Sequence, residues 1–136
     1  MISLILCLVL GIVDAAKDII TFRFKQSVFY NLNRQFWDPL VSWKNKYKTP
    51  LTPFKPKWYY PVLAPKLEER FPFSSTMLVF LTDAWHLLKS TMIVCICLAI
   101  TVSPYFEVWY YNVGMFIAYG LVWNGAFNLG YNKLFV

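Results

Sequence analysis

Three aspartates and one histidine lie within long apolar runs of the sequence, and they are the first candidates for chemistry. Asp14 and Asp18 are four residues apart in the first run, and Asp83 and His86 are three apart in a later one. Both spacings place the two side chains on one face of a helix. An ionisable group at the centre of a membrane costs about 2.5 to 3.5 kcal/mol on insertion scales, so such groups are paired or functional.

One interpretation of these residues is a satisfied polar network, because buried charges are normally paired. The acids of the first run would pair with Lys89, and Asp83 would pair with Lys17. Asparagines of the last apolar run would bridge the remaining groups. The residues that this network adds to the acids are Lys17, Lys89, Asn124 and Asn128.

Two functional interpretations use the same residues and stay open. A histidine ordinarily titrates near neutral pH, so His86 beside carboxylates could relay protons or ions. A metal ion could instead be bound by three carboxylates and one imidazole, although one histidine is few for zinc or iron. The ligands of that metal site would be Asp14, Asp18, Asp83 and His86.

A catalytic role would draw on Asp83, His86 and Ser90, which share one helix face. A histidine beside an aspartate is not a triad without a placed nucleophile. The sequence contains no glycine-rich phosphate loop, no H-E-x-x-H, no G-x-S-x-G and no C-x-x-C. Whether the protein is an enzyme is therefore open, and no particular cofactor is indicated.

Three apolar segments must position these residues, and each is long enough to cross a membrane as a helix. Of the 136 residues, 58% are hydrophobic and 20% aromatic, which fits one membrane unit better than several soluble domains. We predict an all-α membrane protein with a single domain over residues 1–136. Its helices are expected at about 2–22, 76–102 and 106–130.

The faces of the outer two segments predict how the helices pack. A stripe of small and polar residues on the first should face other helices, because lipid cannot satisfy it. Glycines on the third allow close helix approach. The stripe consists of Cys7, Gly11, Asp14, Asp18 and Thr21, and the glycines are Gly114, Gly120 and Gly125.

The first segment could also be a signal peptide, cleaved after residue 15 or 16. No basic residue precedes its apolar run, however. Signal peptides begin with a positively charged region, so we expect the segment to be retained as a helix. The three cysteines all lie in apolar runs and are expected to be buried thiols.

Residues 23–75 form a basic, aromatic and proline-rich loop, with ten Lys or Arg and three acids. Its apolar residues have helical spacing up to a break expected at Asp38, before Pro39. Basic and aromatic residues at a membrane favour anionic lipid headgroups over nucleic acid as the partner. The expected lipid-interface residues are Trp37, Trp43, Lys44, Lys46, Lys48 and Trp58.

The charge of this loop also predicts the orientation. Short cytoplasmic loops collect Lys and Arg, whereas the turn near Ser103 carries no basic residue. We expect a multi-pass protein of the bacterial inner membrane, with the N-terminus outside and the C-terminus inside.

Two segments, Phe36–Tyr47 (FWDPLVSWKNKY) and Thr82–Lys89 (TDAWHLLK), resemble an uncharacterised group of small membrane proteins of bacteria and their phages. The resemblance covers residues 36–89 and carries over no activity. It favours a shared site where loop and helix meet. We predict a structural or interaction protein with an intramembrane Asp/His cluster, the alternative being an enzyme or an ion-handling protein that uses that cluster.

Overall fold

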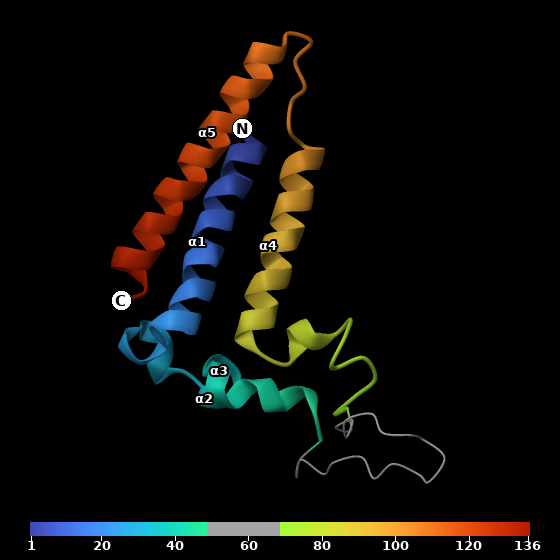
Figure 1. The fold of residues 1–136 in the computed structure, drawn as a ribbon, viewed down its shortest axis with the longest axis vertical. Coiled ribbons are helices and arrows are strands. Elements are labelled where there is room, and N and C mark those ends of the chain that lie inside the picture. The colour runs from blue at the N-terminus through green and yellow to red at the C-terminus, as the bar shows by residue number, and fades with distance from the viewer. Residues whose placement is uncertain (49–68) are drawn as a thin grey trace, which may run out of the picture.

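The computed structural model describes residues 1–48 and 69–136, and the described part of the chain is helical with no strand. Three long helices run beside one another, α1 (Ile2–Phe22), α4 (Ala84–Thr101) and α5 (Trp109–Leu129). The middle position belongs to α1, which packs along both α4 and α5 (Figure 1). The all-α prediction is thereby confirmed, and α1 covers the range expected from the sequence.

Small residues bring α1 and α5 together. A Cβ atom added to Gly11 would lie 2.3 Å from the Trp123 carbonyl oxygen and 2.8 Å from the Ala126 Cβ. One turn further along, a Cβ atom on Gly130 would lie 2.8 Å from the Ala15 Cβ. Two small residues four positions apart on α1 thus meet two on α5 and the turn that follows it, which lets the backbones approach closely.

The glycines expected to make this contact are elsewhere. Gly114, Gly120 and Gly125 are exposed, and a Cβ atom at any of them would meet nothing within 4 Å. The prediction about these three residues was wrong, because the buried side of α5 is set by Ala126 and Gly130. On α1 the predicted stripe is correct as far as Asp14, but Thr21 is exposed.

A hydrogen-bonded chain joins the three helices at the end where α1 begins. The Tyr119 hydroxyl of α5 donates to Ser3 Oγ of α1 at 2.9 Å. Tyr119 Oη also lies 2.7 Å from Oγ of Ser103, which follows α4. Ser3 is fully buried, so a polar partner is needed there.

The second long helix is shorter than predicted. It was expected from about residue 76, but α4 begins at Ala84, and a 3-10 turn at Val79–Leu81 precedes it. Asp83 has extended backbone angles and accepts a hydrogen bond from the His86 backbone N–H, which makes it the N-cap. The third helix likewise starts at Trp109, later than the predicted 106, and a π turn at Gly130–Leu134 follows it.

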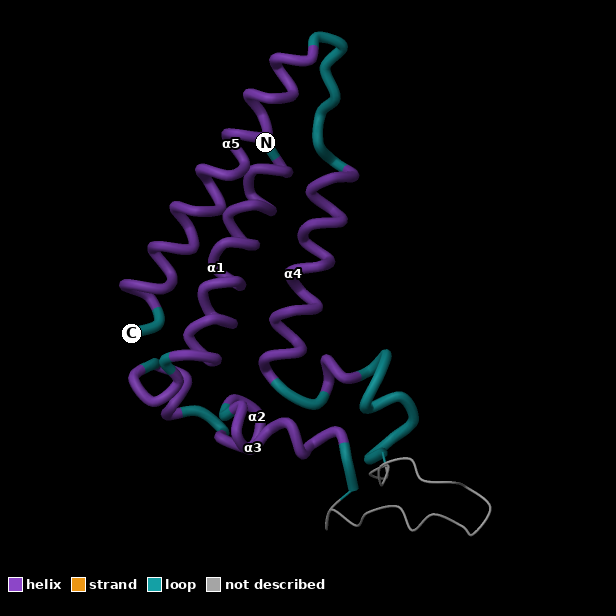
Figure 2. Tube along the Cα trace, viewed as in Figure 1, coloured by secondary structure: helices purple, strands orange, loops and turns teal. Residues whose placement is uncertain are grey.

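A set of short helices crosses the end of the bundle where α1 ends and α4 begins (Figures 1 and 2). We call α2 (Arg34–Trp37), α3 (Pro39–Ser42) and the 3-10 turn Trp43–Lys46 the platform. The break predicted at Asp38 is confirmed, since Asp38 caps α3 by accepting from the Leu40 N–H at 3.0 Å. Phe29 lies in the core with Ile19, Ile20 and Ala84, and Phe36 and Trp37 of α2 pack against that core.

Among the described helices, α4 alone has both the length and the hydropathy of a membrane span. Its 18 residues would extend about 27 Å at 1.5 Å per residue. Helix α1 carries three charged residues, Asp14, Lys17 and Asp18, and aromatic and asparagine residues lower the hydropathy of α5.

Candidate functional site

The charged residues of α1 are paired with one another. Lys17 Nζ lies 2.6 Å from Asp14 Oδ1 and 3.4 Å from Asp18 Oδ1. Lys17 therefore forms ion pairs with both acids of the same helix, and these two acids are one turn apart. The pairs expected across helices were those between the α1 acids and Lys89 and between Asp83 and Lys17. This prediction was wrong, because Lys17 is paired with the acids of its own helix.

Asp83 and His86 form a second, separate pair at the start of α4. Nδ1 of His86 lies 2.7 Å from Oδ2 and 2.9 Å from Oδ1 of Asp83. The carboxylate is buried, whereas the His86 side chain keeps 27% of its surface exposed. A neutral imidazole that donates from Nδ1 has Nε2 as an acceptor, and no described residue bonds to that atom.

This pair lines a pocket between the platform and the bundle. The pocket holds about 300 Å³. It is bounded by Asp83, Trp85 and His86 of the α4 start, by Thr21 near the end of α1, and by the α3 side of the platform. Because Thr21 lies at the last turn of α1, the pair sits at the edge of the bundle and not in its interior. The platform residues that line the pocket are Pro39, Leu40, Ser42 and Trp43.

Two residues that sequence reasoning missed hold the platform in place. Asn45 Nδ2 donates to the Thr82 carbonyl oxygen at 2.9 Å and to the Gln35 carbonyl oxygen at 2.6 Å. Ser74 Oγ donates to the Lys46 carbonyl oxygen at 2.6 Å. The only sequence signal for the contact between Asn45 and Thr82 was the resemblance of two segments. Asn45 belongs to the first, Phe36–Tyr47, and Thr82 to the second, Thr82–Lys89.

The remaining members of the predicted polar network do not join this site. Lys89 Nζ lies 4.9 Å from the centroid of the Trp85 ring. Asn124 and Asn128 are exposed and hydrogen-bond along their own helix, with Asn128 Nδ2 2.9 Å from Asn124 Oδ1. Ser90 is half-buried on α4, one turn beyond His86.

The predicted metal ligands are likewise not brought together. No three His, Cys, Asp or Glu side chains among the described residues are grouped so that they could hold a metal ion. The α1 acids already bond Lys17, and Asp83 bonds His86. The ligand set of Asp14, Asp18, Asp83 and His86 therefore separates into two local pairings.

The expected lipid-interface residues differ in their surroundings. Trp37 stacks on Phe29, with ring centroids 4.8 Å apart, so it serves the core. Trp43 is 42% exposed, and Lys44 Nζ lies 5.8 Å from its ring centroid. Lys46 approaches the Tyr47 ring in the same way, and Lys48 is exposed. Trp58 lies outside the described residues.

No protein-family model, curated protein or solved structure matches this chain. What the site can do thus follows from its geometry. A histidine held by a buried carboxylate can accept a proton at Nε2 from a molecule in the pocket. The same pair can also serve only to cap α4 and fill the junction with the platform.

Proposed function

We propose that the protein is an integral protein of the bacterial inner membrane, in which α1, α4 and α5 all cross the bilayer. The observation that carries this proposal is the outward exposure of large apolar side chains along both outer helices. On α4, Ile100 is 72% exposed, and on α5, Phe116 is 79% and Leu121 is 69% exposed. Apolar surface of this extent favours lipid as its environment.

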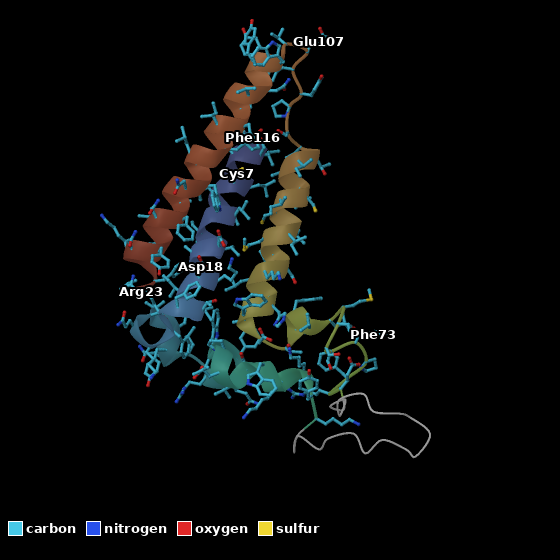
Figure 3. The ribbon with its side chains drawn as sticks, in the orientation of Figure 1. Cys7, Asp18, Arg23, Phe73, Glu107 and Phe116 are labelled. Atoms are coloured by element: carbon cyan, nitrogen blue, oxygen red, sulfur yellow. The ribbon has the colours of Figure 1, made fainter. Side chains whose placement is uncertain are left out.

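The helix lengths and ends support the same arrangement. Helices α1 and α5 have 21 residues each, about 31 Å at 1.5 Å per residue, against a hydrocarbon core of about 30 Å. Arg23 lies at the platform end and Glu107 at the opposite end (Figure 3). The aromatic group Trp109, Tyr110 and Tyr111 begins α5, in keeping with a membrane interface there.

The platform gives this protein a structural or interaction role at the cytoplasmic face. Lys44 and Lys46 pack over aromatic rings on a segment that runs across the bundle end. Basic and aromatic side chains so arranged favour contact with anionic headgroups. The N-terminus is then outside and the C-terminus inside, since positive charge collects in the cytoplasm.

Cysteine labelling tests the crossings and the orientation. In a background with Cys7, Cys95 and Cys97 replaced by alanine, Lys46→Cys should react with an impermeant maleimide only after the inner membrane is permeabilised. Ser103→Cys should react in intact spheroplasts. The reverse pattern would invert the orientation, and equal reactivity of both positions in intact spheroplasts would contradict the crossing of α4, the long helix between them.

A second candidate function, proton transfer at the Asp83–His86 pair, is favoured by the His86 ring lining the pocket. In this proposal Nε2 is the proton-exchanging group at the platform end of a path across the bilayer, because the pair lies at that end of the bundle. Proteoliposomes with an internal pH dye should then equilibrate faster than empty vesicles. His86→Gln should abolish the difference, whereas Lys89→Gln, one turn further along α4, should preserve it. If the native protein conducts no faster than empty vesicles, this candidate is excluded.

A further inference from the structure

A cavity of about 560 Å³ lies beside the junction of α1 and the platform, and it shares Thr21, Pro39 and Leu40 with the histidine pocket. Its wall begins in the last turn of α1 and continues through the 3-10 turn Phe24–Gln26. The platform residues Arg34, Asp38, Pro39 and Leu40 form its remaining side with Tyr30.

The charges around this cavity are unbalanced. Three cations line it, Arg23, Lys25 and Arg34, and a single carboxylate, that of Asp38. Arg34 uses that carboxylate, since its Nη2 lies 2.8 Å and its Nε 3.3 Å from Asp38 Oδ2. Two positive charges are therefore in excess around the cavity.

The two remaining cations differ in their contacts. The Arg23 guanidinium is set over the Tyr131 ring, with Cζ 5.4 Å from the centroid. Lys25 is exposed and has no ion pair in the described part of the chain. Arg23 is thus held against an aromatic ring that does not itself line the cavity, and Lys25 can adjust to a ligand.

The same cavity has an apolar rim. Phe22 is 74% exposed and Leu40 is 77% exposed, and both line it. Exposed apolar side chains next to unpaired cations fit a molecule that has an anionic group and hydrocarbon chains. An inorganic anion would use the cations but leave the apolar rim in water.

We propose that this cavity binds one anionic phospholipid, with its phosphate at Arg23 and Lys25 and its chains over Phe22 and Leu40. The proposal rests on the proposed membrane function and adds a defined lipid site to it. It places the headgroup at the end of α1, where the proposed membrane arrangement puts the cytoplasmic interface.

Native mass spectrometry of the full chain in neutral detergent tests this site. Phosphatidylglycerol and phosphatidylcholine are added in equal amounts, and the retained lipid is counted. The native protein should retain one phosphatidylglycerol in preference to phosphatidylcholine. Lys25→Gln should weaken that retention about fivefold, since a basic residue near an anionic lipid contributes about 1 kcal/mol. Lys133→Gln is the matched control and should have no effect. This exposed lysine does not line the cavity, and it lies at the same end, because its neighbours Tyr131 and Phe135 contact Arg23 and Val28.

Three outcomes would overturn the lipid site. Equal losses in the two variants would mean diffuse attraction to the whole basic end. No preference for phosphatidylglycerol would remove an anionic lipid as the occupant, and displacement of the lipid by millimolar inorganic phosphate would indicate a plain anion site. Carbonate extraction distinguishes a failure of the lipid-site proposal from a failure of the membrane proposal. Both variants should stay in the membrane fraction even if the cavity binds no lipid.

Discussion

The Asp83 carboxylate has two roles at once toward His86. Its Oδ1 accepts from the His86 backbone N–H at 2.9 Å and so caps α4. Both of its oxygens also lie within 2.9 Å of Nδ1 of the His86 ring. The Asp83 side chain therefore both caps the helix and orients the imidazole. Substitutions are needed that change one of these two roles and leave the other intact.

We expect Asp83→Ala to remove the preference of the His86 ring for a single tautomer. In the native protein the neutral ring should carry its proton on Nδ1, because only that tautomer donates to the carboxylate. The ¹⁵N chemical shifts of the ring should report this state and its loss in Asp83→Ala. Removal of the cap should also cost about 0.5 to 2 kcal/mol of stability.

Asp83→Asn is the control for this experiment, because asparagine caps helices about as well as aspartate. Its stability should remain near that of the native protein. A native ring protonated on Nε2 alone would contradict the assigned orientation.

Gly11→Ala should destabilise the contact between α1 and α5. The new Cβ atom would lie 2.3 Å from the Trp123 carbonyl oxygen, so one backbone must shift. We expect a loss of about 1 to 3 kcal/mol, the usual cost of overpacking, in reversible unfolding from mixed micelles. Gly114→Ala places the same methyl group where nothing lies within 4 Å and should be near neutral. Equal effects of the two substitutions would show that α1 and α5 do not pack at Gly11.

Asn45→Ala should loosen the platform from the start of α4. The substitution removes three hydrogen bonds, each worth about 0.5 to 1.5 kcal/mol. Asn45 Nδ2 donates to the Thr82 and Gln35 carbonyl oxygens, and Asn45 Oδ1 accepts from Gln35 Nε2 at 3.4 Å. Trypsin should then cut more rapidly at Lys44 and Lys46 in the solubilised protein. Asn31→Ala changes an exposed asparagine with no side-chain hydrogen bond in the described residues, so its digestion should match the native rate.

The turn at residues 69–75 should lose stability as the pH falls. Hydrogen bonds from the Ser75 hydroxyl, and then from the backbone N–H groups of Ser75 and Phe73, lower the pKa of Glu69 from its ordinary 4.5. A lowered folded-state pKa means that the stabilisation is complete above pH 4.5 and disappears as the pH falls through the folded-state value.

Amide hydrogen exchange at Phe73 and Ser75 measures this effect. Protection should decrease on acidification below pH 4.5 in the native protein. In Glu69→Gln, which cannot titrate, the protection should not depend on pH in that range. A pH dependence that persists in Glu69→Gln would assign the effect to another group.

The sequence alone determined the helical class, the extent of α1 and the break at Asp38. These features depend on local interactions. The length of an apolar run determines the extent of a helix, and proline restricts the backbone of the residue before it. It also singled out Asp83 and His86, but as two residues on one helix face, with Asp83 paired to Lys17. In the structure Asp83 precedes α4 and reaches His86 as its N-cap. The predicted start of α4 was wrong. The apolar residues before Asp83 have the composition of a helix, but in the structure they form a 3-10 turn at Val79–Leu81, and the helix begins only after the capping aspartate.

Only the tertiary structure decided which glycines pack and which charges pair. Gly11 and Gly114 are alike in sequence terms, and the difference arises from which side of each helix meets its neighbour. The lysine at position 17 could reach partners on two helices, and the carboxylates of Asp14, one turn away, and of the adjacent Asp18 were closer. The junction of Asn45 with Thr82 joins residues 37 positions apart. Such long-range contacts depend on how rigid helices fit together, and no local periodicity records that fit.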